Sequence, residues 1–278
     1  AAFASSSTAI AATDLSNIGG KTTGAVTLAN KVRLQGSQSE VATALVGDSS
    51  VAASKGNTEA RVTTTVNVNQ GEEIAGVNNI QGIFASGVSD SLSSLASGGK
   101  STAKLNTITG DDGDVAITVS DSAFESSSAT LTAADLIAVG GATTGTVTVT
   151  NAVKISGDTS QLTNTLVGGS SSVTASSALV TVSDAAFSTS NATIAATALS
   201  DIGGKTSGAV TVTKAVKITG STADLTNTLV SGSSLVIASS ALVTVSDDAF
   251  TTSSATIAAT ALSDIGGKTS GAVTVTKA

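Results

Sequence analysis

The chain copies itself at a fixed offset in its last third. Residues 184–215 (DAAFSTSNATIAATALSDIGGKTSGAVTVTKA) recur at 247–278 with three changes, which gives an offset of 63 residues. The same offset relates Phe124, Phe187 and Phe250. A period of this length is typical of proteins in which each supersecondary unit buries its apolar face against the next copy. The sequence therefore predicts a stacked repeat architecture, and it says far more about architecture than about activity.

Each repeat divides into two similar halves. Alignment of residues 178–184 with residues 209–214 gives half-units of 31 and 32 residues, and each contains an alternating run, a turn and a run with helical spacing. An elementary unit of about 31 residues fits roughly nine times into the chain. We expect the repeat segments to be a unit at 1–68, a degenerate unit with an irregular loop at 69–120, units at 121–183 and 184–246, and a partial unit at 247–278.

Short helices are predicted before the Gly-Gly pairs. Within residues 9–18, the apolar residues Ala11, Leu15 and Ile18 have the i, i+4, i+7 spacing of a helix face. Gly19-Gly20 then predicts that the helix ends at a glycine in the left-handed conformation. The same pattern recurs before the glycine pairs at 203–204 and 266–267.

Strands and further helices are predicted from the rest of each repeat. Alternation of β-branched residues predicts strands with one buried face, at 26–28, 117–119, 147–149, 180–182, 210–212, 243–245 and 273–275. A polar cap residue with an acid or amide three positions later is a capping box, which predicts a helix start. Such boxes occur at Ser37/Glu40, Asp158/Gln161 and Ser221/Asp224.

Strands that alternate with helices at this period predict an α/β solenoid. Its units would have about 31 residues, with a parallel sheet on one face and short helices on the other. The alternative is an all-β solenoid, in which residues 192–199 (ATIAATAL) form a strand instead of a helix.

Composition excludes several classes of function. The chain has no Cys, His, Trp or Tyr, so disulfides, imidazole catalysis and aromatic stacking are absent. The available Ser, Lys and acidic groups recur from repeat to repeat, whereas an active site needs one unique constellation. A net charge of −7 argues against nucleic acid as a partner, and no apolar run approaches the roughly 20 residues of a membrane span. We expect a protein that is not an enzyme.

Two motifs suggest ligands. Gly-Gly-Lys-Thr or Gly-Gly-Lys-Ser resembles a phosphate loop, but Leu199 stands where that loop needs glycine, so a helix cap is expected. The loop Gly110-Asp111-Asp112-Gly113-Asp114 concentrates carboxylates, which are ligands suited to calcium. Asp111, Asp112 and Asp114 are therefore candidate Ca²⁺ ligands, although the EF-hand spacing is absent. The alternative is a solvated turn.

The ends of the sequence fall within repeat units. Residues 1–3 match 185–187, and residues 276–278 match 213–215. We expect either an ordered window of a much longer protein or open ends that stack on other copies. For the second case, edge strands would pair across the junction, and the candidate self-association residues are Ala1, Phe3, Val273 and Val275.

The repeat strings resemble those of known surface proteins. Residues 129–150 (ATLTAADLIAVGGATTGTVTVT), 192–213 (ATIAATALSDIGGKTSGAVTVT) and 221–230 (STADLTNTLV) are similar to repeats of very large secreted bacterial surface proteins, the adhesin-like and S-layer-like kind frequent in cyanobacteria. The resemblance covers nearly all of the chain except 69–113. It implies export and a role at the cell surface or in the extracellular matrix.

Two functions are compatible with these patterns. The first is a structural protein, a rigid rod or filament subunit that self-associates through open solenoid ends. The second is an adhesin stalk or binding module that presents the 69–113 face to a glycan or cell-surface ligand. The lack of Trp and Tyr weakens glycan binding, which commonly uses aromatic platforms.

Overall fold

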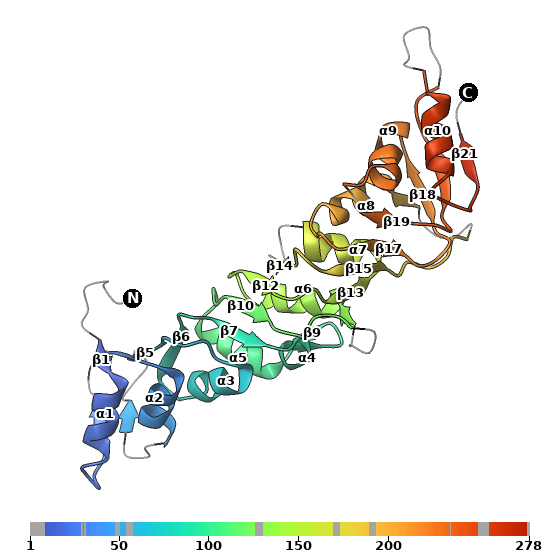
Figure 1. The fold of residues 1–278 in the computed structure, drawn as a ribbon. Helices are drawn as coiled ribbons and strands as arrows, with labels where there is room; N and C mark the ends of the chain where they lie inside the picture. Colours follow the sequence, from blue (N-terminus) through green and yellow to red (C-terminus); the bar gives the residue numbers. More distant parts are fainter. Residues whose placement is uncertain are drawn as a thin grey trace. The chain divides into compact units, whose positions relative to one another are not determined.

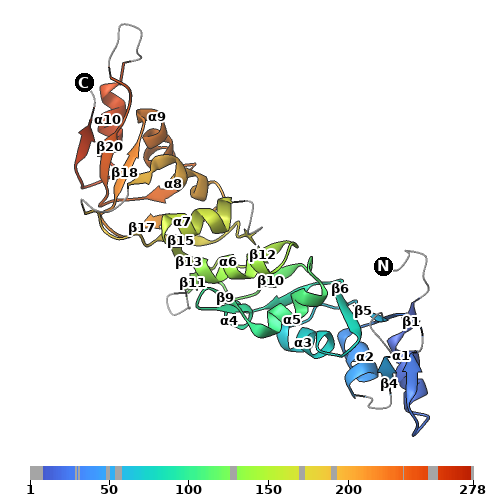
Figure 2. The same cartoon turned by 180° about the vertical axis from the view of Figure 1, so that it is seen from behind.

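The structure is a computed structural model that forms two compact units. Unit 1 comprises residues 1–120 and 138–148, and unit 2 comprises residues 121–137 and 149–278. Figures 1 and 2 show the elements that make up each unit. The residues described are 9–28, 30, 32–47, 51–53 (backbone only), 58–125, 130–168, 173–188, 193–233, 235–249 and 256–276.

The protein is an α/β protein with repeating βα units and parallel sheets. In unit 2 the repeat consists of two parts, which we call half-repeat A and half-repeat B. Half-repeat A contains β16 (Ile194–Ala195), α8 (Ala196–Gly203) and β17 (Val210–Val212). Half-repeat B contains β18 (Lys217–Gly220), α9 (Thr222–Leu225), the π-helical turn η3 (Thr226–Val230), β19 (Val236–Ile237) and β20 (Leu242–Val245). The all-β alternative is wrong, because residues 196–199 of the string ATIAATAL form the start of α8 and only residues 194–195 form a strand.

Elements of unit 2 return after 63 residues. The earlier half-repeat B contains β13 (Lys154–Gly157), α7 (Thr159–Leu162), η2 (Thr163–Val167), β14 (Val173–Thr174) and β15 (Leu179–Val182). It is preceded by β11 (Leu131–Thr132). The last half-repeat A contains α10 (Ala259–Gly266) and β21 (Val273–Val275).

Unit 1 begins with the same two parts. Half-repeat A is formed by β1 (Ile10–Ala11), α1 (Ala12–Gly19) and β2 (Val26–Leu28). Half-repeat B is formed by β3 (Arg33–Gly36), α2 (Gln38–Ala42), η1 (Thr43–Gly47), β4 (Val51–Ala53) and β5 (Thr58–Val62).

The remainder of unit 1 departs from this pattern. It contains α3 (Val68–Ala75), β6 (Ile80–Phe84), β7 (Val88–Asp90), α4 (Leu92–Leu95), β8 (Ala96–Ser97), β9 (Lys100–Ser101), α5 (Ala103–Asp111) and β10 (Ile117–Val119). The boundary between the units passes through α6 (Ala133–Ala142) and β12 (Val147–Val149). The division into five repeat segments stays a prediction.

The strands form several short parallel sheets instead of a single one. In unit 2 the orders are β11-β13-β15-β17-β19 and β16-β18-β20-β21, so that β15 to β19 alternate between two sheets. In unit 1, β1-β3-β5-β6 forms a parallel sheet, β7 pairs in parallel with β10, and β2 pairs in parallel with β4. Strands β8 and β9 form an antiparallel pair. The sequence did not reveal this arrangement because strands such as β16 and β19 have only two residues.

The predicted strands and capping boxes are confirmed. Val180 lies opposite Val210 in the β15–β17 pair, and both side chains are buried. Reciprocal capping-box hydrogen bonds are present at the starts of α2, α7 and α9. A fourth box, formed by Asn67 and Gln70, starts α3 and was not predicted.

The prediction of a left-handed stop after α1, α8 and α10 is wrong. The C-cap residues Gly20, Gly204 and Gly267 have φ angles of −68°, −68° and −67°, in the right-handed region. Positive φ angles occur at Gly98 and Gly99, which form the turn between β8 and β9. There the Gly-Gly pair makes a hairpin turn, which needs left-handed residues.

Adjacent half-repeats approach each other at their backbones. A Cβ atom on Gly208 would lie 2.2 Å from the carbonyl oxygen of Ala178, so only glycine fits there. The Thr206 hydroxyl donates to the same oxygen and accepts from the Gly208 amide at 3.0 Å. The same arrangement recurs 63 residues later at Gly271, Thr269 and Ala241. The Thr of the Gly-Gly-Lys-Thr motif therefore joins half-repeats.

A carboxylate after one strand caps the helix that precedes that strand. Asp247 Oδ2 accepts from the amide of Thr222 at 2.8 Å and from its hydroxyl at 2.6 Å. Asp184 makes the same pair of bonds to Thr159, both at 2.7 Å. These bonds satisfy a first-turn amide that the helix itself leaves without an acceptor, so the repeated Ser-Asp pairs stabilise helix starts.

We predict that Asp184→Ala will lower the free energy of unfolding by about 1–3 kcal/mol, because the Thr159 amide and hydroxyl lose their acceptor. Chemical denaturation in urea would measure the change. Asp201→Ala, at an exposed position in α8, is the control and should change stability by less than about 0.5 kcal/mol. Equal effects of the two substitutions would contradict the capping role.

Candidate functional site

Two half-repeats A of identical sequence have different neighbours. Residues 193–213 and 256–276 are the same, and they contain α8–β17 and α10–β21 respectively. Helix α8 contacts α7 and η2 from the preceding half-repeat B and α9 and η3 from the following one. Helix α10 contacts α9 and η3 of the preceding half-repeat B, and no following half-repeat is present among the described residues.

The exposure of matched side chains shows which face is uncovered. Ile202 and its counterpart Ile265 are both fully buried, so this position faces the preceding half-repeat. Leu199 is fully buried, whereas its counterpart Leu262 is only half-buried. This second position therefore faces the following half-repeat. We call the uncovered surface formed by Ile257, Leu262, Val273 and Val275 the terminal face.

Strand edges are also open at the terminal face. Strand β17 lies between β15 and β19, and the Val210 amide donates to the Leu235 carbonyl at 3.0 Å. Strand β21 pairs with β20 and is the last strand of its sheet. Val275 is 46% exposed, whereas its counterpart Val212 is 5% exposed. An exposed apolar edge strand of this kind can pair with another chain.

Only two of the four predicted self-association residues can be placed in the structure. Val273 and Val275 lie on the terminal face. Ala1 and Phe3 lie outside the described residues. In unit 1, α1 shows the opposite pattern to α10, because Leu15 is buried and Ile18 is 56% exposed. Sequence reasoning missed Leu262 and Ile18 because their counterparts at internal positions are core residues.

The predicted calcium ligands lie where α5 ends. Asp111 Oδ2 accepts from the Gly82 amide at 2.8 Å, and Asp112 Oδ2 accepts from the Phe84 amide at 2.7 Å. Asp112 is buried and Asp114 is exposed. The first two carboxylates therefore join α5 to strand β6.

Burial raises the pKa of both carboxyl groups. Burial raises the pKa of Asp112, the hydrogen bond from the Phe84 amide lowers it, and the neighbouring Asp114 and Asp111 carboxylates raise it further. Burial also raises the pKa of Asp111, against the hydrogen bond from the Gly82 amide. Loss of solvation is the dominant cause at both residues.

Calcium binding by this loop stays a prediction. Among the residues that the structure describes, no group of three acidic side chains is arranged to hold a metal ion. Binding by Asp111 and Asp112 would compete with their hydrogen bonds to β6. That competition favours a structural role for both carboxylates.

The 69–113 segment contains ordered helices. Helices α3 and α5 pack together, and a Cβ atom on Gly71 would lie 2.6 Å from Ile108 Cδ1. Lys104 links the two helices through Glu72 Oε2 at 3.1 Å and Asn69 Oδ1 at 2.7 Å. The predicted binding face is thus a packed helix pair with the β8–β9 hairpin beside it in sequence.

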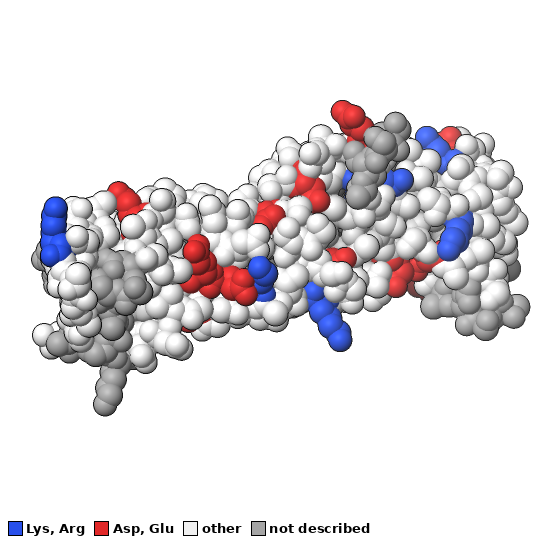
Figure 3. All heavy atoms as spheres, turned by 90° about the horizontal axis from the view of Figure 1, so that it is seen from below, with Lys and Arg blue, Asp and Glu red and all other residues white. Residues whose placement is uncertain are grey.

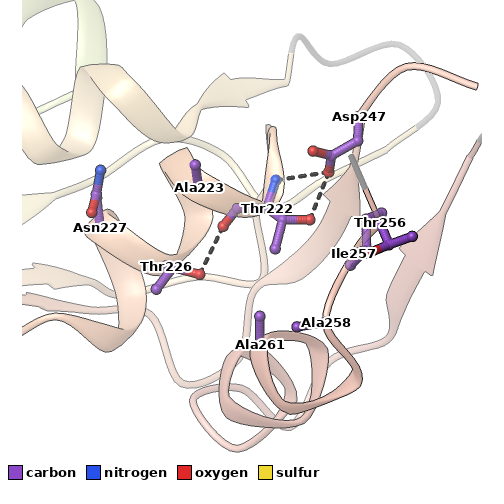
Figure 4. Close-up of a pocket in the computed structure, with 9 residues that line it drawn as sticks. All are labelled: Thr222, Ala223, Thr226, Asn227, Asp247, Thr256, Ile257, Ala258 and Ala261. Carbon is purple, nitrogen blue, oxygen red and sulfur yellow. Dashed lines mark hydrogen bonds between the residues drawn. The ribbon is translucent and has the colours of Figure 1, made fainter. Parts of the chain in front are cut away.

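A pocket recurs at the repeat period in unit 2. One copy, of about 470 Å³, lies between the start of α9 and the start of α10, and the other, of about 350 Å³, lies 63 residues earlier. Figure 4 shows that Asp247 and Thr222 meet at one wall, and that Ala261 of α10 and Ala258, which precedes this helix, form another. Because Asp247 Oδ2 is already bonded to Thr222 twice, the polar wall belongs to the helix cap.

Charged groups are sparse. Figure 3 shows acidic side chains scattered among uncharged atoms, with few Lys and Arg side chains on that face. In the described part of the chain no helix is long and apolar enough to cross a membrane.

No protein-family model matches the chain, and neither a characterised protein nor a solved structure shows significant similarity to it.

We predict that Leu199→Ala will cost about 2–5 kcal/mol of unfolding free energy, as expected for a fully buried leucine. Leu262→Ala should cost clearly less, because Leu262 is already partly exposed. The surrounding sequence is identical, so helix propensity cancels in this comparison. Denaturation of dilute protein in urea would test it, and equal losses would contradict an uncovered terminal face.

We predict that stability will fall as pH rises above the ordinary Asp range of about 4. The raised pKa values mean that the native state binds more protons than the unfolded state in this window. Asp112→Asn should make the free energy of unfolding depend less steeply on pH in this window, while the Asn side chain keeps an oxygen acceptor for the Phe84 amide. Asp112→Ala should lower stability by about 1–3 kcal/mol, because a buried amide loses its partner. Urea unfolding between pH 4 and 7 would measure both effects, and an unchanged slope in Asp112→Asn would contradict the assignment.

Proposed function

We propose that the chain is a structural repeat protein whose half-repeats stack as an α/β solenoid. It would form a rigid rod or filament by association at its ends, and it would not act as an enzyme. The observation that carries this proposal is the pair of identical half-repeats A. Among the described residues, the α8–β17 copy packs between two half-repeats B, whereas the α10–β21 copy packs on one and leaves Leu262 and Val275 partly exposed.

The contacts between half-repeats are compatible with an array of any number of repeats. The Gly208 approach to Ala178 recurs at Gly271 and Ala241, and the Asp184 cap recurs at Asp247. Since each contact involves only adjacent half-repeats, its formation does not depend on the total number of repeats. An architecture of this kind gives a stiff object whose length is set by the number of units.

A location at the cell surface or in the extracellular matrix is part of the proposal. The resemblance of residues 129–150 and 192–213 to repeats of secreted bacterial surface proteins supports it. The absence of Cys is compatible with an oxidising compartment. A surface rod also needs no unique catalytic constellation, in agreement with the recurrence of the polar groups from repeat to repeat.

We predict that the purified chain will form rods whose length increases with protein concentration. Val275→Lys should suppress this association, because it places a charge on the open edge of β21. Thr197→Lys, at an exposed position of α8, is the matched control and should leave association unchanged. Light scattering would give the mass and cryo-electron microscopy the shape. A chain that stays monomeric at all concentrations, or two variants that behave alike, would overturn association through the terminal face.

A further inference from the structure

Pockets lie between the starts of neighbouring helices in both units. In unit 2 a pocket of about 350 Å³ lies between the starts of α7 and α8, and one of about 470 Å³ lies between the starts of α9 and α10. In unit 1 a pocket of about 360 Å³ lies between the starts of α3 and α5. These volumes fall in the range of small-molecule sites, so the lining decides what each pocket can hold.

The two pockets of unit 2 combine polar and apolar side chains. In the smaller one, Thr159, Asn164 and Asp184 supply the polar groups, and Ile194 and Ala198 supply apolar surface. The larger pocket has the same residue types 63 positions later, namely Thr222, Asn227, Asp247, Ile257 and Ala261 (Figure 4). A ligand that fits one of these pockets therefore has a second site in the next repeat.

The aspartate of each pocket has an oxygen that the helix cap does not use. Asp184 Oδ2 and Asp247 Oδ2 accept both hydrogen bonds of their caps, and no group of the described residues donates to either Oδ1 atom. The corresponding Asp90 of unit 1 differs, because its Oδ2 accepts from the Val68 amide at 3.1 Å and its Oδ1 accepts from the Ser91 amide at 2.8 Å. The unit 2 pockets thus keep a carboxylate acceptor for a ligand.

The charge of the lining selects against anions. None of the nine described residues that line each unit 2 pocket is Lys or Arg. An ionised Asp without a neighbouring cation repels a phosphate or carboxylate ligand. In the unit 1 pocket, by contrast, Lys104 is one of the lining residues.

The remaining groups favour a ligand that is rich in hydroxyl groups. A carboxylate oxygen accepts from O–H donors, a Thr hydroxyl can donate and accept, and an Asn amide can do both. The methyl groups of Ile194 and Ala198 suit the C–H surface of a sugar ring, a contact that needs no aromatic side chain. A neutral hexose offers several O–H donors and such a surface in one molecule.

We infer that each unit 2 pocket binds one hexose unit of a neutral sugar. Asp184 Oδ1 and Asp247 Oδ1 accept from sugar hydroxyls, and the Ile and Ala side chains contact the ring. This inference goes beyond the proposed function and does not depend on association of chains. It assigns sugar recognition to the regular repeats of unit 2 instead of the 69–113 segment. Two sites on one chain also bind a polysaccharide more tightly than a single hexose.

An NMR titration of the ¹⁵N-labelled full chain with glucose, galactose and mannose, each added separately, would test the inference. At least one hexose should shift amide signals of residues 159–164 and 193–198, and of their counterparts 222–227 and 256–261. The expected Kd is about 1–10 mM, as for a ligand of about a dozen heavy atoms. The 6-phosphate of the bound hexose should bind at least about tenfold more weakly, because the carboxylate repels it.

Matched variants separate the pockets from the rest of the helix surface. Ala198→Leu/Ala261→Leu fills both pockets and should weaken hexose binding at least about tenfold. Thr197→Leu/Thr260→Leu changes exposed neighbours on the same helices and is the control, which should keep the Kd within about twofold.

A third variant tests the role of the carboxylate. Asp184→Asn/Asp247→Asn keeps an oxygen acceptor for the helix starts but removes the negative charge. It should bind the neutral hexose more weakly and discriminate less against the sugar phosphate.

The outcomes are decisive and independent of the proposed function. Absence of shifts at both pockets with all three hexoses at about 100 mM, well above the expected Kd, would overturn the inference. Equal losses of binding in the filled and control variants would also overturn it. Binding of ethanolamine without binding of any hexose would show that the carboxylate selects an ammonium group, and would overturn the sugar assignment. Light scattering of the same samples reports association of chains, so either proposal can fail while the other stands.

Discussion

The close approach of backbone to backbone at Gly208 is the contact on which the stacking of half-repeats depends. The carbonyl oxygen of Ala178 occupies the space that a Cβ atom would need, and the Thr206 hydroxyl bonds to that oxygen. Glycine and threonine thereby set both the separation and the register of neighbouring half-repeats. Once this spacing is fixed, small side chains suffice to fill the interior, as the pairing of Val180 with Val210 shows.

Polar side chains complete the same framework. Thr228 is buried, and its hydroxyl donates to Asp224 O at 2.8 Å and to Ala196 O at 2.9 Å. The first acceptor belongs to its own helix and the second to the neighbouring half-repeat. A hydroxyl that bonds a carbonyl four residues back competes with the backbone ladder, in agreement with the π-helical turn η3. In a chain with 2% aromatic residues, such hydrogen bonds between half-repeats act together with the buried Leu, Ile and Val side chains of the core.

Local patterns were readable from the sequence, and distant partners were not. The box at Ser221 and Asp224 depends on residues three positions apart, so its spacing alone predicted a helix start. In contrast, Asp111 and Asp112 bond amides 29 and 28 residues away on β6, and no local pattern distinguishes that role from a calcium loop. The terminal face was only partly predictable, because the exposure of Leu262 depends on which described elements pack against α10 and not on the local sequence, which is identical around Leu199.

The two-sided character of half-repeat A has a consequence for how such a gene can change. Duplication or loss of 63 residues preserves the alternation of A and B, so every inter-repeat contact of the type seen at Gly208 and Asp184 is retained. Duplication of a single half would set two like halves side by side, with no β18 to pair with β16. A change of length by whole 63-residue repeats therefore keeps these contacts, whereas a change by one half-repeat does not.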